Sequence, residues 1–177
     1  MSGGMIKVNV SGKADVVMTT KGDIVTYSTE RVRKAVGNNS QILVCDSGET
    51  DGNKYDDNTI SFVIACSDED SDLETGDDKA QIRLPFQFEL TSISANVNTA
   101  PTGSTISIQV QEDGSDILST PITIDASETT SETAAVSPVI SDSTLASNSI
   151  ISIDLDQIGS STAGTGLKVN LIGYRVV

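Results

Sequence analysis

The second part of the chain alternates apolar and polar residues, and this pattern constrains the fold more than any other feature. Single polar residues separate Ile106, Ile108 and Val110, and the same spacing recurs over residues 151–155 and 167–171. Successive side chains of a β-strand point to opposite faces, so the pattern predicts strands with one buried face. Ser and Thr make up 43 of the 177 residues, and such side chains favour strands and turns over helices. We therefore expect an all-β protein.

Residues 59–177 contain enough short strand candidates for one closed core. The candidates cover residues 60–66, 80–88, 90–97, 106–110, 117–118, 122–124, 151–155 and 167–171. Turn signals separate them, among them Pro101 with Gly103 and the Asp113-Gly114 pair. This spacing predicts a β-sandwich of the jelly-roll type. In residues 80–88 we expect Ile82, Leu84, Phe86 and Phe88 to point inward, and in residues 141–149 one short helical turn.

Residues 1–58 differ, because their apolar runs are only a few residues long and are interrupted by polar turns. Isolated strands of this length need a partner surface to become ordered. We therefore predict an extended mounting segment over residues 1–58, ordered by other copies of the chain or by a larger particle. Its candidate anchoring residues are Ile6, Val8, Val10, Val16, Val17, Ile24 and Tyr27. A further apolar run covers residues 42–45, and the basic stretch over residues 31–34 reads as a solvated turn or a docking patch.

The net charge of −14 is unevenly distributed along the chain. Residues 1–34 contain six basic and three acidic residues, whereas residues 61–177 contain four basic and seventeen acidic ones. The acidic part would repel a phosphate backbone, so we expect no nucleic acid as a partner. The start of the chain does not have the pattern of a signal peptide, and no apolar stretch approaches the length of a membrane span. We expect no membrane insertion.

The residue types present argue against an enzyme. The chain has no His, which removes the usual general base and the commonest transition-metal ligand. A carboxylate pair could serve a glycosidase, but the chain has no Trp and few other aromatics to stack on sugar rings. We expect no catalytic residues and no cofactor. Cys45 and Cys66 form no CxxC pair, and we expect two buried free thiols, although a disulfide is not excluded by the sequence.

A dense group of acidic residues lies within residues 67–78. Asp68, Asp70 and Asp72 have the spacing of the first three ligands of a calcium loop. The resemblance to a calcium loop then fails, because Leu73 occupies the glycine position and Lys79 that of the final glutamate. We interpret the segment as an exposed, mobile acidic loop without a metal, and a loose divalent-cation site over residues 68–78 remains the alternative.

Two stretches of the sequence contain motifs that recur in known proteins. Residues 19–28, 31–43 and 50–55 resemble a segment of phage tail-fibre and other virion appendage proteins, in which "TKGDLL-Y" is followed by "R-PVG-NGQVL-AD" and "GLKW". Asp46 stands at the Asp position of that segment, and Tyr55 replaces its Trp. Residues 79–175 resemble a domain of marine phage virion proteins, through residues 79–83, 99–104, 117–119 and 156–159. The resemblance implies a homotrimer that contacts other virion proteins, and it supplies no catalytic residues.

Three functions follow as hypotheses. In the first, the protein is a non-enzymatic capsid decoration or head-fibre protein of a virion, mounted by residues 1–58 and displaying the sandwich outward. The shortness of the chain favours this reading. In the second, it is a tail-fibre or tail-tip protein that binds a host surface polysaccharide, although stacking aromatics are scarce. In the third, it is a secreted adhesin module, against which the missing signal peptide argues.

Overall fold

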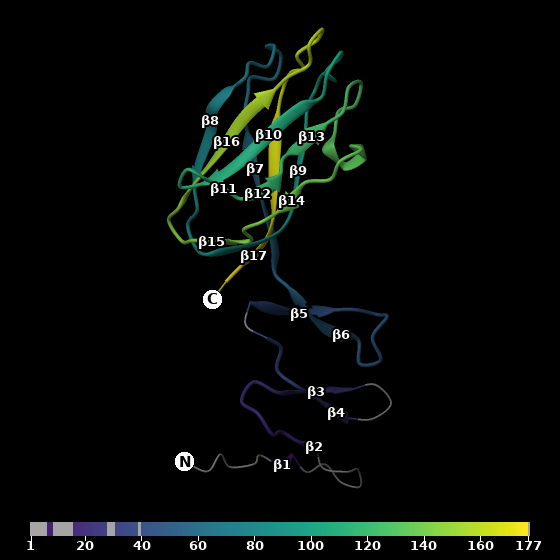
Figure 1. Cartoon of the computed structure of the whole chain (residues 1–177). Helices are drawn as coiled ribbons and strands as arrows, with labels where there is room; N and C mark the ends of the chain where they lie inside the picture. The colour runs from purple at the N-terminus through teal and green to yellow at the C-terminus, as the bar shows by residue number, and fades with distance from the viewer. Residues whose placement is uncertain (1–6, 9–15, 28–30, 39, 177) are drawn as a thin grey trace. The chain divides into compact units, whose positions relative to one another are not determined.

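The chain consists of two compact units, Met1–Asn58 and Thr59–Val177. The computed structural model describes residues 7–8, 16–27, 31–38 and 40–176 (Figure 1). Within these residues the only helical segment is the 3₁₀ turn η1, Ser131–Thr133. The prediction of an all-β fold is therefore confirmed.

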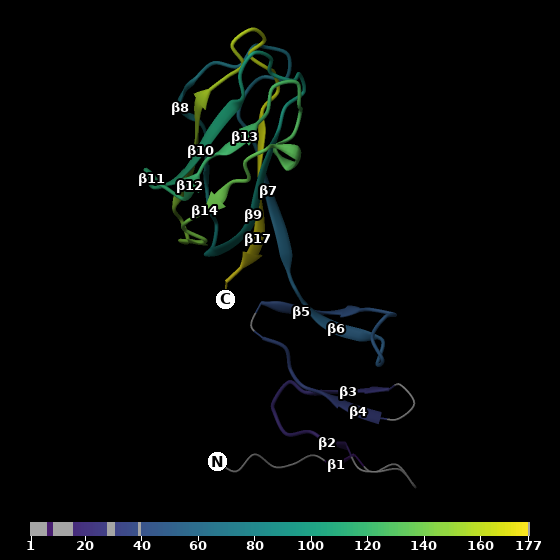
Figure 2. The ribbon, with the colours of Figure 1, turned by 45° about the vertical axis from the view of Figure 1, so that its right-hand side comes forward.

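Unit Thr59–Val177 contains two antiparallel sheets that form separate layers (Figures 1 and 2). One sheet has the order β15-β9-β17-β7, with strands Thr144–Leu145, Phe88–Asn96, Lys168–Arg175 and Thr59–Ala65. The other has the order β11-β10-β16-β8, with strands Ser115–Asp116, Ile106–Glu112, Ile150–Gln157 and Gly76–Arg83; β13, Ile122–Ile124, also pairs with β10. A separate pair joins β12, Leu118–Thr120, to β14, Val139–Ile140.

The connections between the main strands repeatedly cross from one sheet to the other. β7, β9, β15 and β17 belong to one layer, and β8, β10, β13 and β16 belong to the other. In each layer a late strand lies between two early ones: β17 between β7 and β9, and β16 between β8 and β10. Neighbouring strands in this unit are therefore distant in sequence, and most of its pairing is long-range.

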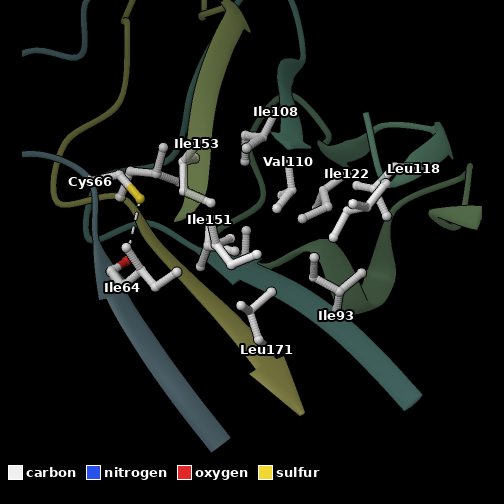
Figure 3. Close-up of a cluster of buried hydrophobic side chains, with 14 of the residues drawn as sticks. Ile64, Cys66, Ile93, Ile108, Val110, Leu118, Ile122, Ile151, Ile153 and Leu171 are labelled. Atoms are coloured by element: carbon white, nitrogen blue, oxygen red, sulfur yellow. Dashed lines mark hydrogen bonds between the residues drawn. The ribbon is translucent and has the colours of Figure 1, made fainter. Parts of the chain in front are cut away.

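The core lies between the two layers and is made of aliphatic side chains from both. Ile106, Ile108 and Val110 of β10 are fully buried, as the alternation predicts. Ile151, Ile153 and Leu155 of β16 are buried on the same side, and Figure 3 shows several of these side chains converging with those of β9, β17 and β7. The interior is almost entirely apolar, so this unit is stabilised by its own core.

Two expectations for this unit are wrong in detail. Residues 80–88 do not form one strand: β8 ends at Arg83 and β9 begins at Phe88. Pro85 lies in the interruption and has no N–H to donate to a ladder. Leu84 and Phe88 are buried, whereas Ile82 and Phe86 are half-buried. Residues 141–149 contain no helical turn; they contain the two-residue strand β15, Thr144–Leu145, in which Leu145 pairs with Phe88 and is fully buried.

Unit Met1–Asn58 is a series of three two-stranded hairpins. They pair β1 with β2, β3 with β4, and β5 with β6; the strands are Lys7–Val8, Val16–Val17, Ile24–Tyr27, Arg31–Lys34, Gln41–Cys45 and Asn53–Asp57. Reading residues 31–34 as a turn is wrong, because they form β4. The basic side chains of residues 31–34 give no strand pattern in the sequence, and the strand forms by backbone pairing with Ile24–Tyr27.

Candidate functional site

The hairpins of the first unit bury polar groups instead of an apolar core. Among residues 18–27, 32–38 and 40–58, whose side chains the structure describes, the buried side chains are those of Asp23 and Thr26, and no large apolar side chain is buried. By contrast, the second unit buries more than twenty hydrophobic residues. The two units are therefore held together internally by different forces: hydrogen bonds and ion pairs in the first, and apolar packing in the second.

Asp23 organises the β3–β4 hairpin. Its Oδ2 accepts hydrogen bonds from the backbone N–H of Thr19 at 3.1 Å and of Thr20 at 2.9 Å, and from Nη1 of Arg33 at 2.9 Å. Its Oδ1 accepts a further bond from the N–H of Val36 at 3.0 Å. The hydrogen bond from Arg33 lowers the pKa of Asp23 to about 2, against the opposing effect of burial, and the backbone donors add to the lowering. As a carboxylate, Asp23 therefore joins the residues that precede β3 to those at the end of β4.

Asp51 links the second hairpin to the third. It lies in the turn between β5 and β6, where its Oδ2 accepts hydrogen bonds from Thr26 Oγ1 at 3.0 Å and from Lys34 Nζ at 3.1 Å. Lys34 also donates to the carbonyl of Asn53 at 2.6 Å. The hydrogen bond from Lys34 lowers the pKa of Asp51. These polar contacts join the second hairpin to the third.

The same hairpins expose large apolar side chains to solvent. We call the set the assembly surface; its members are between 42 and 64 % exposed and are Val25, Tyr27, Val32, Val36, Ile42 and Leu43. Ile42 and Leu43 are consecutive in β5 and therefore point to opposite faces of their hairpin. Val25 and Val32 likewise lie on opposite faces of the β3–β4 hairpin, because Val32 pairs with Thr26. In both hairpins, therefore, each face carries at least one exposed apolar side chain among the described residues.

The anchoring residues proposed from the sequence have different positions. Ile6 and Val10 lie outside the described residues. Val8 belongs to β1, and Val16 and Val17 form β2. Ile24 is half-buried in β3, whereas Tyr27 is 64 % exposed. Of the predicted set, Tyr27 thus belongs to the assembly surface.

The other members of the assembly surface were missed as anchoring residues. Ile42 and Leu43 belong to the apolar run over residues 42–45, and the length of this run is a signal by which they could have been predicted as anchoring residues. Val32 lies between two arginines in β4, and no apolar pattern signals it. Only the pairing of β4 with β3 brings Val32 to a hairpin face.

The two cysteines are free and have different environments. Cys66 is buried in the sandwich, and its Sγ donates to the carbonyl oxygen of Ile64 at 3.3 Å, as Figure 3 shows. Burial raises the pKa of its thiol to about 11. The expectation that both thiols are buried is wrong for Cys45, which is exposed at the end of β5. Cys45 is exposed because the β5–β6 hairpin buries no large apolar side chain among its described residues.

The acidic loop over residues 67–78 is attached to the sandwich by a buried side chain and a backbone hydrogen bond. Leu73, which occupies the glycine position of a calcium loop, is buried in the core, and its N–H donates to the carbonyl of Gly164 at 2.9 Å. Asp68 Oδ1 accepts hydrogen bonds from the N–H groups of Asp70 and Ser71, which lower its pKa. Asp68 thus binds its own loop. Within the described part of the chain, no three Cys, Asp or Glu residues are arranged to hold a metal ion.

The outer face of the β8–β16–β10 sheet is acidic. Asp154 of β16 is 6 % exposed and accepts a hydrogen bond from the N–H of Asp78 at 2.7 Å. Burial raises the pKa of the neighbouring Asp156, and the carboxylates of Asp154, Asp116 and Asp77 raise it further. Such a face repels other anions.

A cavity of about 260 Å³ lies beside β9. One wall comes from Thr91, Ser92 and Ile93 of β9, and the facing wall comes from η1 and the loop before β14. The chemistry of this cavity is polar, because hydroxyl groups and the carboxylate of Glu132 predominate in its lining.

No family model matches the chain, and no curated protein matches it significantly. Among the residues that the structure describes, no helix is long and apolar enough to cross a membrane.

Proposed function

We propose that the protein is a non-enzymatic structural component of a bacteriophage particle, mounted through residues 1–58 and displaying the sandwich outward. The observation that carries this proposal is the contrast between the units. The sandwich has a complete core, whereas the hairpins expose the assembly surface on both faces. Two-stranded hairpins are at best marginally stable alone in water, so this unit requires a covering partner.

The covering partner is other copies of the same chain. A closed symmetric assembly buries identical patches without leaving an open edge. The resemblance to phage appendage proteins supports three copies. In such a trimer Val25, Ile42 and Leu43 pack against their equivalents or against neighbouring hairpins. Burying the exposed part of each side chain contributes about 1 kcal/mol per residue.

The sandwich is of the jelly-roll type in this proposal. Two nested Greek keys place each late strand between two early strands, and the orders β7-β17-β9-β15 and β8-β16-β10-β13 have this property. Because both layers are closed by a shared apolar core, the unit can project from a particle without support. Its acidic outer face keeps displayed copies soluble.

A capsid location, as a decoration or head-fibre protein, is the first candidate. Cryo-electron microscopy of the particles, with the subunit density fitted to the sandwich, tests it directly. Density at symmetric positions on the capsid is the expected result. Density confined to the tail would favour the second candidate, and absence of the protein from purified particles would contradict the proposal.

The second candidate is a tail-fibre or tail-tip protein that binds a host surface polysaccharide. The cavity beside β9 favours it, because hydroxyl groups and a carboxylate line a hollow at the surface of the sandwich.

A further inference from the structure

The cavity beside β9 is bounded by a loop that is irregular but firmly held. The loop joins β13 to β14 and contains η1. Thr130 caps η1 by accepting a hydrogen bond from the N–H of Glu132 at 3.2 Å. The N–H of Ala135 donates to Asp125 Oδ2 at 2.8 Å, and Thr123 Oγ1 donates to the carbonyl of Val136 at 3.1 Å. The wall of the cavity is therefore preorganised, which reduces the entropy cost of binding.

The loop is also fastened to β9 itself. The Oγ of Ser131, which is 6 % exposed, accepts a hydrogen bond from the backbone N–H of Ala95 at 2.9 Å. This bond leaves the hydroxyl proton of Ser131 available for another acceptor. The N–H of Val97 donates to the carbonyl of Thr129 at 3.0 Å. The two walls of the cavity thus keep a fixed separation.

Several polar groups of the cavity have no partner within the described chain. The carboxylate of Glu132 forms no hydrogen bond or ion pair there, and neither do the hydroxyls of Ser92 and Ser137. Together with Ser131 they offer both donors and a charged acceptor. Pro138 and Ile140 add apolar surface to the same hollow.

This combination matches one chemical class of ligand. A phosphate or an acidic sugar would be repelled by Glu132 and by the acidic surface of this unit. A divalent cation requires several oxygen ligands of high charge, and the cavity has a single carboxylate. A neutral sugar ring has hydroxyls that donate to a carboxylate and accept from serines, and C–H groups that contact Pro and Ile.

We propose that the cavity beside β9 is a binding site for one uncharged sugar residue of a glycan, held chiefly by Glu132, Ser131 and Ser137. Its volume is below the roughly 300–1,000 Å³ of sites that enclose drug-sized ligands, so it accommodates a single ring of a longer chain. The inference rests on the second candidate function for its glycan, but it requires no particular location on a particle.

The test is saturation-transfer NMR and calorimetry on the full-length protein. The probes are the methyl glycosides of glucose, galactose, mannose and N-acetylglucosamine, with the methyl glycoside of sialic acid as an anionic comparison. We expect at least one neutral probe to bind with a dissociation constant of about 1–10 mM, since the contacts are few and lack aromatic stacking. Sialic acid should show no saturable binding.

Variants then locate the site. Glu132→Gln should weaken binding about tenfold, because a charged acceptor is lost, and Ser137→Ala should weaken it several-fold. Glu74→Gln, an exposed carboxylate outside the cavity, is the matched control and should bind as the unaltered protein does. Circular dichroism verifies that each variant remains folded.

Two results would overturn the inference. One is that no neutral probe binds. The other is binding that Glu132→Gln and Ser137→Ala leave unchanged, which would place the sugar elsewhere. Either result leaves the mounted-virion proposal standing, because imaging of the particle tests that proposal without any sugar.

Discussion

At the scale of single residues, Ile108 shows how an apolar residue of the alternating pattern stabilises the core. Its side chain is fully buried between the sheets, whereas the neighbouring Ser107 points to the other face and is half-buried. Ile108→Ala should lower the free energy of unfolding by about 2–4 kcal/mol, because apolar contacts are lost and a cavity remains. Ser107→Ala is the control and should change it by about 0.5 kcal/mol or less. Chemical denaturation measures both, and equal effects would contradict the assigned facing.

Gly173 is a position at which the backbones of two central strands approach closely. A Cβ there would lie 1.9 Å from the carbonyl oxygen of Glu89 and 2.8 Å from the ring of Phe88. The register of β17 against β9 shifts at this point. Gly173→Ala should therefore lower the free energy of unfolding by about 2 kcal/mol or more. Gly52→Ala, in the other unit, is a comparison variant for the steric effect at Gly173. Its Cβ would meet nothing within 4 Å, but its positive φ of 72° adds modest strain.

Cys66 should be chemically silent in the folded protein. The thiolate is the reactive form, and a pKa of about 11 leaves very little of it at neutral pH. In a Cys45→Ser variant, which removes the exposed thiol, alkylation at pH 8 should proceed only after denaturant unfolds the sandwich. Rapid labelling of the native variant would show that the thiol is accessible.

Asp23 makes the first unit sensitive to acid. The folded pKa is depressed from 3.8 to about 2, so its stabilising contribution is complete above about pH 4 and is lost as the pH falls towards 2. At neutral pH, Asp23→Asn should accelerate hydrogen exchange over residues 19–36. The difference between this variant and the unaltered protein should narrow between pH 4 and pH 2. A difference independent of pH would mean that the charge of Asp23 is not what holds the hairpin.

At the scale of elements, the strands that could be predicted are those whose own sequence alternates. β10, β16 and β17 follow from their periodicity, and the Asp113-Gly114 turn between β10 and β11 adopts the positive φ values expected of it, 47° and 82°. β4 could not be predicted, since its basic residues have no apolar pattern and it exists through pairing with β3. The short strand β15 depends on Phe88, a partner distant in sequence.

The candidate sites were less predictable than the strands, for a physical reason. The cavity beside β9 combines residues 91–93 with residues 131–140, which only the fold brings together. Its residues are common hydroxyl types without a recognisable spacing. The assembly surface was predicted as a segment, residues 1–58, but not as a set of side chains, because exposure depends on which hairpin face each residue occupies.

The assembly surface yields a prediction at this scale. Val25→Ser combined with Leu43→Ser should abolish association of the full-length chain, since both side chains lose the burial that association provides. Val136→Ser is the matched control: Val136 is 53 % exposed, but it lies on the sandwich. Light scattering measures the association state. Unchanged association of the double variant would exclude these side chains from the interface.

For the whole molecule, we propose that the sandwich provides the stability of one chain and that the hairpins provide its assembly. The sandwich carries an apolar core that one chain completes, so its folding does not require a partner. The hairpins carry ion pairs and exposed apolar side chains, and in the proposed assembly neighbouring copies cover these side chains.

Native mass spectrometry of the full-length chain and of residues 59–177 tests this division most directly. We expect a trimer for the full-length protein, and for residues 59–177 a monomer that retains the circular dichroism of a β-sandwich. A monomeric full-length protein would contradict the account, and so would a truncated protein that remains trimeric, because the assembly surface would then not hold the copies together.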